Sequence, residues 1–77
     1  MPIYFFDIAI GTTRIKDPDG TDLPSAEFAR EHALETIREL MGTRVLQMLT
    51  PADCIIEVRN SERGLLFKVP FTDAIAP

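Results

Sequence analysis

Three carboxylates crowd one short segment and are the first candidates for chemistry. Asp17, Asp19 and Asp22 surround Gly20, and hard cations such as calcium prefer oxygen ligands. An EF-hand loop needs glycine sixth and glutamate twelfth, whereas counting from Asp17 the glycine is fourth and Phe28 is twelfth. Aspartate and glycine also form turns, and an acid near a helix start favours the helix dipole. We therefore predict a turn and a helix entry here, and no metal site.

His32 is the only histidine and Cys54 the only cysteine. A metal site usually needs several ligands, and the sequence has neither a second histidine nor a cysteine pair. We expect His32 to be an exposed helix residue and Cys54 to be a small buried hydrophobe. A nucleophilic pair of Cys54 and His32 is an alternative that requires the fold to bring them together.

Asp7 interrupts an otherwise apolar segment. A buried carboxylate must be paired or hydrogen-bonded, and such groups often mark functional sites. Strand alternation offers a simpler account, in which Asp7 lies on a half-solvated face near the end of its strand. We expect this second arrangement.

The basic residues fall into two groups that could form a basic patch. They are Arg30, Arg38 and Arg44 in the helical segment, and Arg59, Arg63 and Lys68 in the C-terminal third. Glutamates interleave with the helical arginines and make that face net acidic. The sequence has no phosphate-binding glycine loop, nucleophile elbow or HExxH motif. We assign no catalytic residue, cofactor or metal ligand, and the balance is against an enzyme.

The elements that must position these residues begin with four strand-like segments. They are Ile3 to Ile10, Thr13 to Lys16, Cys54 to Arg59 and Leu65 to Phe71. Most are rich in β-branched and aromatic residues and are bounded by turn formers, while the polar second segment is typical of an edge strand. Alternation in the last segment places Leu65, Phe67, Val69 and Phe71 on one face.

One amphipathic helix is predicted to begin at about Ala26, with Ser25 as its N-cap. Its apolar stripe contains Ala29, Ala33, Ile37, Leu40 and Met41. Gly42 could end the helix, but the apolar pattern continues, and we predict continuation toward Thr50.

This order predicts an α+β domain, ββαββ, in which one helix packs across one face of a four-stranded antiparallel sheet. Residues 1–77 suffice for a single domain. The second face would carry the apolar side chains of Ile3, Phe5 and Ile55 beside Asp7, and large exposed apolar patches are uncommon on monomers. We expect these four residues to form an interaction surface that a homodimer covers. The alternative is that the tail from Asp73 to Pro77 and a few exposed apolar residues account for it.

Composition limits the classes of partner and the setting of the protein. The net charge of −4 repels phosphate backbones and anionic lipid, so nucleic acid is a disfavoured partner. The lone cysteine fits a reducing compartment. The N-terminus lacks a signal-peptide pattern, and the sequence has no run long enough to span a membrane. We expect a cytoplasmic location.

Four blocks of the sequence resemble one protein family. They are Met1 to Ile8, Asp17 to Pro24, the alanine-rich helix, and Val69 to Ala74. Together they resemble the family catalogued as domain of unknown function six-eight-nine-four, short bacterial proteins common in alphaproteobacteria. The sequence departs from the family pattern between Gly42 and Cys54. The resemblance implies a compact bacterial domain and no particular activity.

The function that we expect is that of a small interaction or regulatory module that binds another protein, through a homodimeric sheet or an exposed strand edge. A nucleic-acid-linked regulator similar to antitoxin domains is the alternative. A small-molecule binder is the third possibility, with a pocket that contains Asp7 or the pair of Cys54 and His32.

Overall fold

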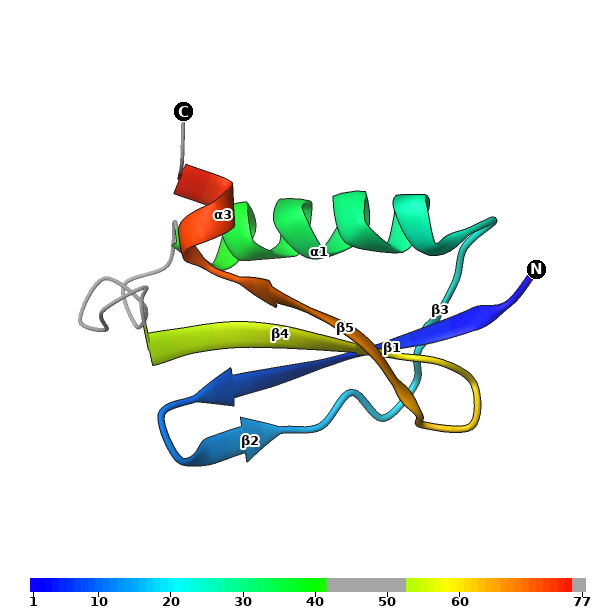
Figure 1. The fold of residues 1–77 in the computed structure, drawn as a ribbon, viewed down its shortest axis with the longest axis horizontal. Coiled ribbons are helices and arrows are strands. Elements are labelled where there is room, and N and C mark those ends of the chain that lie inside the picture. The colour runs from blue at the N-terminus through cyan, green and yellow to red at the C-terminus, as the bar shows by residue number, and fades with distance from the viewer. Residues whose placement is uncertain (42–52, 76–77) are drawn as a thin grey trace.

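The computed structural model describes residues 1–41 and 53–75 of the chain. In chain order the elements are β1 (Ile3–Ile10), β2 (Thr13–Ile15), β3 (Thr21–Asp22), α1 (Ala26–Met41), β4 (Cys54–Arg59), β5 (Leu65–Pro70) and α3 (Thr72–Ile75). The predicted α+β class with an antiparallel sheet and one main helix is confirmed (Figure 1). The predicted four-strand ββαββ order is wrong in detail, because β3 makes a fifth strand.

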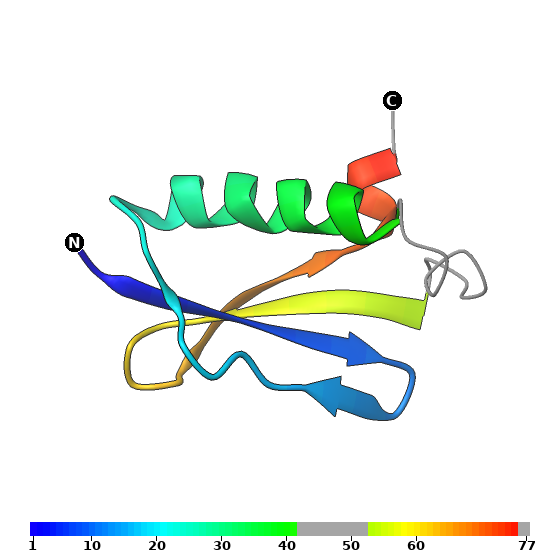
Figure 2. The ribbon, with the colours of Figure 1, turned by 180° about the vertical axis from the view of Figure 1, so that it is seen from behind.

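The sheet has the order β2-β1-β4-β5, and β3 pairs with the start of β1. All the strand pairs are antiparallel. One edge of β1 is paired with β4, and its other edge is shared between β2 and β3. Figures 1 and 2 show α1 lying across a single face of this sheet, with α3 beside the C-terminal end of α1. Within residues 1–41 and 53–75, the other face of the sheet therefore carries no helix.

The core lies between α1 and the sheet. Ala29, Ala33 and Ile37 on the helix are fully buried, as the predicted stripe requires. Two small alanines in this stripe let the helix backbone approach the sheet closely. The sheet contributes the buried side chains of Tyr4, Phe6, Cys54, Ile56, Val58 and Val69, and Phe71 follows β5. Leu40 and Met41 are partly buried beside them.

The extra strand β3 forms because a tight turn returns the chain to the start of β1. Both the Asp19 and Gly20 N–H groups donate to Oδ1 of Asp17, at 3.2 and 3.1 Å, and Gly20 has a φ of 74°. This is the turn predicted from aspartate and glycine. The turn aligns Thr21 opposite Tyr4 in the ladder. The sequence analysis found the turn but not the two-residue strand that it creates.

A register shift between Val58 and Arg59 of β4 changes the predicted face of Leu65. Val58 pairs with Phe67, but Arg59 pairs with Leu65, so one residue of β5 is extra at this point. Leu65 therefore shares a face with Arg59 and is 47% exposed, rather than joining Val69 in the core. The other predicted members of that face, Phe67 and Phe71, do lie on the core side.

The predicted start of the helix at Ala26 is confirmed, and the Ser25 carbonyl accepts a hydrogen bond from the Ala29 N–H at 3.1 Å. The predicted continuation from Gly42 toward Thr50 lies outside the described residues. Neither α1 nor α3 is long and apolar enough to cross a membrane.

Candidate functional site

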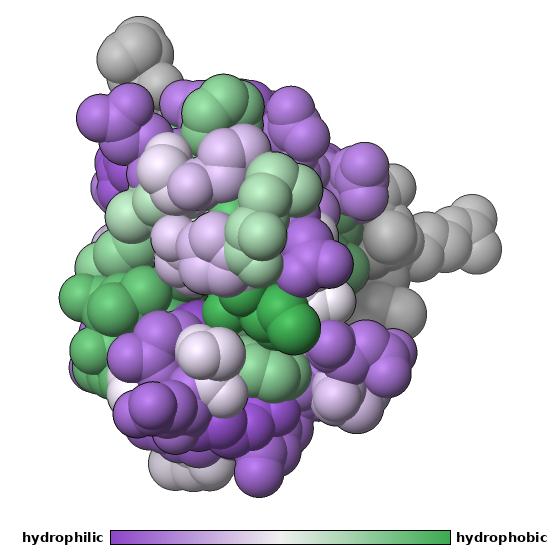
Figure 3. Space-filling model, turned by 90° about the vertical axis from the view of Figure 1, so that its right-hand side faces the viewer, coloured by the Kyte–Doolittle hydropathy of each residue, from purple (hydrophilic) through white to green (hydrophobic). Residues whose placement is uncertain are grey.

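The face of the sheet away from α1, which we call the open face, carries a concentration of charge. Residues directly opposite each other in a ladder share a face. Asp7 lies opposite Glu57, Phe5 opposite Arg59, and Ala9 opposite Arg14 on β2. Figure 3 shows hydrophilic residues gathered at the bottom of the molecule, below the sheet on the side away from α1. The open face is therefore mainly polar at its centre.

Asp7 and Glu57 form a pair of buried carboxylates at this centre. Their side chains are 13% and 5% exposed, and like charges directly opposite each other destabilise a sheet. Arg59 separates them, because its Nε lies 3.2 Å from Asp7 and its Nη2 lies 3.0 Å from Glu57. The remaining Nη1 donates to the Arg63 carbonyl at 3.1 Å. One guanidinium thus contacts a carboxylate on each of two strands, β1 and β4, and links both strands to the β4–β5 turn.

Arg63 reaches the same carboxylate from that turn. Its Nη1 lies 3.3 Å from both oxygens of Asp7, and its Nη2 donates to the Asp17 carbonyl. The guanidinium also lies 4.2 Å from the centre of the Phe5 ring. Arg63 has a φ of 68°, in the left-handed region that costs a residue with a Cβ about 1–2 kcal/mol. The tight turn accounts for this conformation, because the Arg63 N–H donates to the Asn60 carbonyl at 2.9 Å and the Asn60 N–H donates to the Gly64 carbonyl at 2.9 Å.

Asp17 fills the gap between β2 and β3 along the edge of β1. Its N–H donates to Oδ1 of Asp7 at 2.9 Å, and its own Oδ2 accepts the Phe6 N–H at 3.1 Å. A side chain thus replaces the ladder hydrogen bonds that a continuous strand would supply. The Asp7 carboxylate is thereby fixed by one backbone N–H in addition to two arginines.

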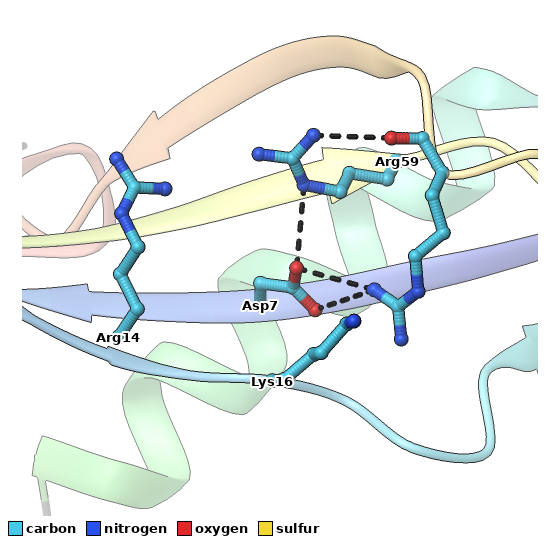
Figure 4. A pocket seen from close by; sticks show the side chains of 5 residues that line it. Asp7, Arg14, Lys16 and Arg59 are labelled. Carbon is cyan, nitrogen blue, oxygen red and sulfur yellow. Dashed lines mark hydrogen bonds and ion pairs between the residues drawn. The ribbon is translucent and has the colours of Figure 1, made fainter.

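The side chains of this cluster line a hollow of about 410 Å³, shown in Figure 4. We call it the basic hollow, and its lining residues are Asp7, Arg14, Lys16, Arg59 and Arg63. Arg14 forms an ion pair with Glu57 through Nη1 only, and its side chain is 63% exposed. Lys16 has no ion-pair or hydrogen-bond partner among the described residues. Four cations lie near the carboxylates of Asp7, Glu57 and Asp17, which leaves an excess of one positive charge.

The structure changes our interpretation of Asp7. It lies on the face without a helix, as alternation predicted, but it is 9% exposed rather than half-solvated. The reason is that Arg59, Arg63 and the Asp17 backbone surround the carboxylate from three elements. Sequence alternation assigns a face, but it does not report the side chains that other segments place over that face.

The predicted interaction surface of Ile3, Phe5, Asp7 and Ile55 does lie on the open face. The chain itself covers part of it. A Cβ added to Gly20 would meet Cγ2 of Ile3 at 2.6 Å and Cε1 of Phe5 at 3.1 Å, so the Gly20 backbone packs directly on these side chains. Ile3 is 39% exposed and Phe5 and Ile55 are half-buried. The apolar part of this surface is consequently smaller than the sequence predicted.

His32 and Cys54 lie apart. The His32 ring packs against the Phe6 ring, with centroids 4.7 Å apart, so His32 is half-buried rather than exposed. Cys54 pairs with Ile10, four residues farther along β1, or about 13 Å at the usual strand rise. Cys54 is 1% exposed, as expected of a buried hydrophobe. Burial raises the pKa of the Cys54 thiol, and the charge of Asp53 raises it further, so neither group supports a nucleophilic pair.

Three members of the cluster were not predicted from the sequence: Arg14, Lys16 and Glu57. Arg59 and Arg63 were identified only as part of a general basic group. A signal for Glu57 and Arg59 was present, because with Ile55 they alternate along one face of the strand. The order of the strands, which places them beside Asp7 and Arg14, is a tertiary property.

The geometry can be set beside known proteins. The sequence model of the family described as Domain of unknown function (DUF6894) matches residues 3–72. The chain belongs to this family. The match extends over β1, β2, β3, α1, β4 and β5, and so includes every residue of the basic hollow in this DUF6894 domain. No curated protein and no solved structure matches the chain.

Proposed function

We propose that this DUF6894 domain is a small interaction module that binds a protein partner through the open face, by way of an anionic group on that partner. One observation carries the proposal. The chain has a net charge of −4, yet four of its eight basic residues line the basic hollow. A cleft whose lining carries an excess of one sign of charge concentrates the opposite charge in solution.

Two of the three arginines of the basic hollow are already held in place. Arg59 and Arg63 are 23% and 30% exposed, and each makes contacts with more than one group. Groups fixed before binding lose less conformational entropy when a ligand arrives. Planar guanidinium groups also present donors in a geometry that suits carboxylate and phosphate oxygens. This arrangement supports recognition of an anionic group rather than general attraction.

A protein partner fits the charge distribution better than nucleic acid does. Nucleic-acid binding needs cations spread along a backbone path, whereas these four cations surround one hollow. The outer face of α1 carries Glu27, Glu31, Glu35 and Glu39, which would repel a long polyanion that extends past the sheet. Nucleic acid is therefore the second candidate, and the experiment below includes it.

The homodimer expected from the sequence fits the edge of β5 better than the open face. Two open faces in contact would bring together two hollows, each with an excess of positive charge. Within the described residues, β5 pairs with β4 alone, and Leu65 and Leu66 near its start are 47% and 45% exposed. An edge of this kind can pair with a strand of another chain.

A comparison of two double variants tests the proposal. Arg14→Gln with Lys16→Gln removes two charges from the basic hollow, while Arg30→Gln with Arg38→Gln removes two exposed charges from α1. Immobilised wild-type protein and both variants would be incubated with a bacterial extract, and retained proteins and RNA would be quantified. We expect the wild type and the variant with Arg30→Gln and Arg38→Gln, which we call the helix variant, to retain the same proteins. The amount of these proteins retained should be at least about tenfold lower on the variant with Arg14→Gln and Lys16→Gln, which we call the hollow variant.

Equal retention by all three proteins would overturn the proposal, and so would the absence of any retained protein. Retention of RNA in place of protein, lost on the hollow variant, would establish the second candidate instead. Circular dichroism of each variant before the experiment would show that the fold is intact, since the substituted side chains lie on the surface.

A further inference from the structure

We propose that the basic hollow binds a phosphomonoester dianion, so that the anionic group recognised by the open face is a phosphate rather than a carboxylate. This inference rests on the proposed function and specifies its ligand.

The charge of the basic hollow favours a phosphate. Four cations line it, and the carboxylates nearby are those of Asp7, Glu57 and Asp17, so the site is positive overall. A single bound carboxylate supplies one negative charge. A phosphomonoester carries about −1.5 to −2 charges near neutral pH. One phosphate therefore offers these cations more negative charge than a single carboxylate does.

The donors fall into a fixed group and a free group. Arg59 and Arg63 are held by Asp7 and the neighbouring turn. Lys16 has no partner within the described residues, and Arg14 uses only Nη1 in its contact with Glu57. In Figure 4 the Lys16 side chain extends toward the Asp7 carboxylate. A phosphate can accept hydrogen bonds at three oxygens, so it can engage fixed and free donors together.

The backbone at Arg63 fixes the position of one of these cations. Its positive φ of 68° is unfavourable for a residue with a Cβ, whereas glycine would adopt it without strain. The conformation directs the guanidinium to Asp7 and over the Phe5 ring. A cation is thus held in place at a cost in backbone energy, beside Lys16, which has no partner in the described part of the chain.

The size of the hollow fits a small headgroup on a larger molecule. Its volume of about 410 Å³ is at the lower end of the range for ligand sites. Ile3 and Ile55 lie on the same face and offer apolar contact to whatever carries the phosphate. The ligand chemistry is accordingly a phosphomonoester, either on a protein side chain or on a free small molecule.

Titrations followed by amide chemical shifts test the inference on the intact chain. The probes are O-phosphoserine, a phosphoserine peptide, its unphosphorylated form, and a peptide with two glutamates in place of the phosphoserine. We expect saturable shifts with both phosphorylated probes at the amides around Lys16, Arg59 and Arg63. Affinity should fall at least about tenfold in the variant with Arg14→Gln and Lys16→Gln, and should be unchanged with Arg38→Gln.

The pH dependence gives a second measurement. The second ionisation of a phosphomonoester has a pKa of about 6, so the ligand loses charge below that value, whereas sulfate remains a dianion. Binding of O-phosphoserine should weaken between about pH 7.5 and pH 5 more than binding of sulfate.

The outcomes separate this inference from the proposed function. Binding of O-phosphoserine without any protein retained from extract would support the phosphate site and overturn the protein-binding role. Equal affinity for the glutamate peptide and the phosphopeptide would overturn the phosphate site and leave the role intact. Loss of binding in Arg38→Gln to the same extent as in the hollow variant would also overturn the site. A phosphopeptide that binds more tightly than O-phosphoserine would identify a protein source, and equal affinities a small molecule.

Discussion

The two faces of this sheet are built from the same strands but are stabilised by different kinds of interaction. On the covered face, Ile56 and Val58 are fully buried beneath the alanine stripe of α1. On the open face, Asp7, Glu57 and Arg59 occupy the intervening positions and are joined by ion pairs. Apolar contact is non-directional and scales with buried area. Ion pairs require particular atoms at particular distances, so the open face depends more on the exact placement of each segment.

The open face also shows why buried charge is tolerated without a second layer. Each buried carboxylate has at least two cationic neighbours: Asp7 contacts Arg59 and Arg63, and Glu57 contacts Arg14 and Arg59. Among the described residues no buried side-chain nitrogen or oxygen lacks a hydrogen-bond partner. A network that satisfies all its members avoids most of the cost of burying charge.

The largest effect is expected from the same change made on each face. Ile56→Ala removes a fully buried side chain from the core and should lower the free energy of unfolding by about 2–4 kcal/mol. Ile55→Ala removes the same atoms from the adjacent, half-buried position on the open face and should cost less than about 1.5 kcal/mol. Urea unfolding would measure both. Equal losses would show that the open face is as well packed as the core.

Removal of the central charge of the open face should have the next largest effect. Asp7→Asn keeps the shape of the side chain but removes its charge from Arg59 and Arg63, and should cost about 2 kcal/mol. The matched control is Asp73→Asn, which weakens an exposed pair with Arg30 and should cost less than about 0.5 kcal/mol. A variant Asp7→Asn that unfolds at the same urea concentration as the wild type would contradict the network described here.

The smallest effect is expected at the β4–β5 turn, which contains Arg63. Arg63→Gly and Arg63→Ala both remove the guanidinium, but only alanine keeps the Cβ that makes a φ of 68° unfavourable. The glycine variant should therefore be more stable than the alanine variant by about 1 kcal/mol. Thermal unfolding of the two proteins in one buffer would measure the difference. The opposite order of stability would mean that the turn does not adopt this conformation in solution.

The fold was largely predictable because it follows from local patterns. The stripe of Ala29, Ala33 and Ile37 has the period of a helix, and the strands alternate apolar and polar residues. The errors arose where a few residues decide the outcome. β3 depends on one aspartate turn, and the misassigned face of Leu65 depends on one register shift. Neither leaves a periodic signal in the sequence.

The candidate site was predictable only in part. The sequence marks Asp7 as unusual and places Arg59 and Arg63 in a basic group, but it does not predict that these arginines contact Asp7. Their positions in sequence differ by more than 50 residues, and the contacts require β1 to lie beside β4 and the turn after β4 to fold back over β1. Strand order has no local signature, so composition alone supported only the weaker idea of a basic patch.

The sequence by itself determined the main helix, four of the strands, the apolar face of the helix and the acidic balance of the chain, because each is a sum or a period over neighbouring residues. The tertiary structure alone decided that four cations and two carboxylates meet on the open face. That difference has a physical reason. Burial patterns average over many residues, whereas a charged site is made of individual contacts between segments that are distant along the chain.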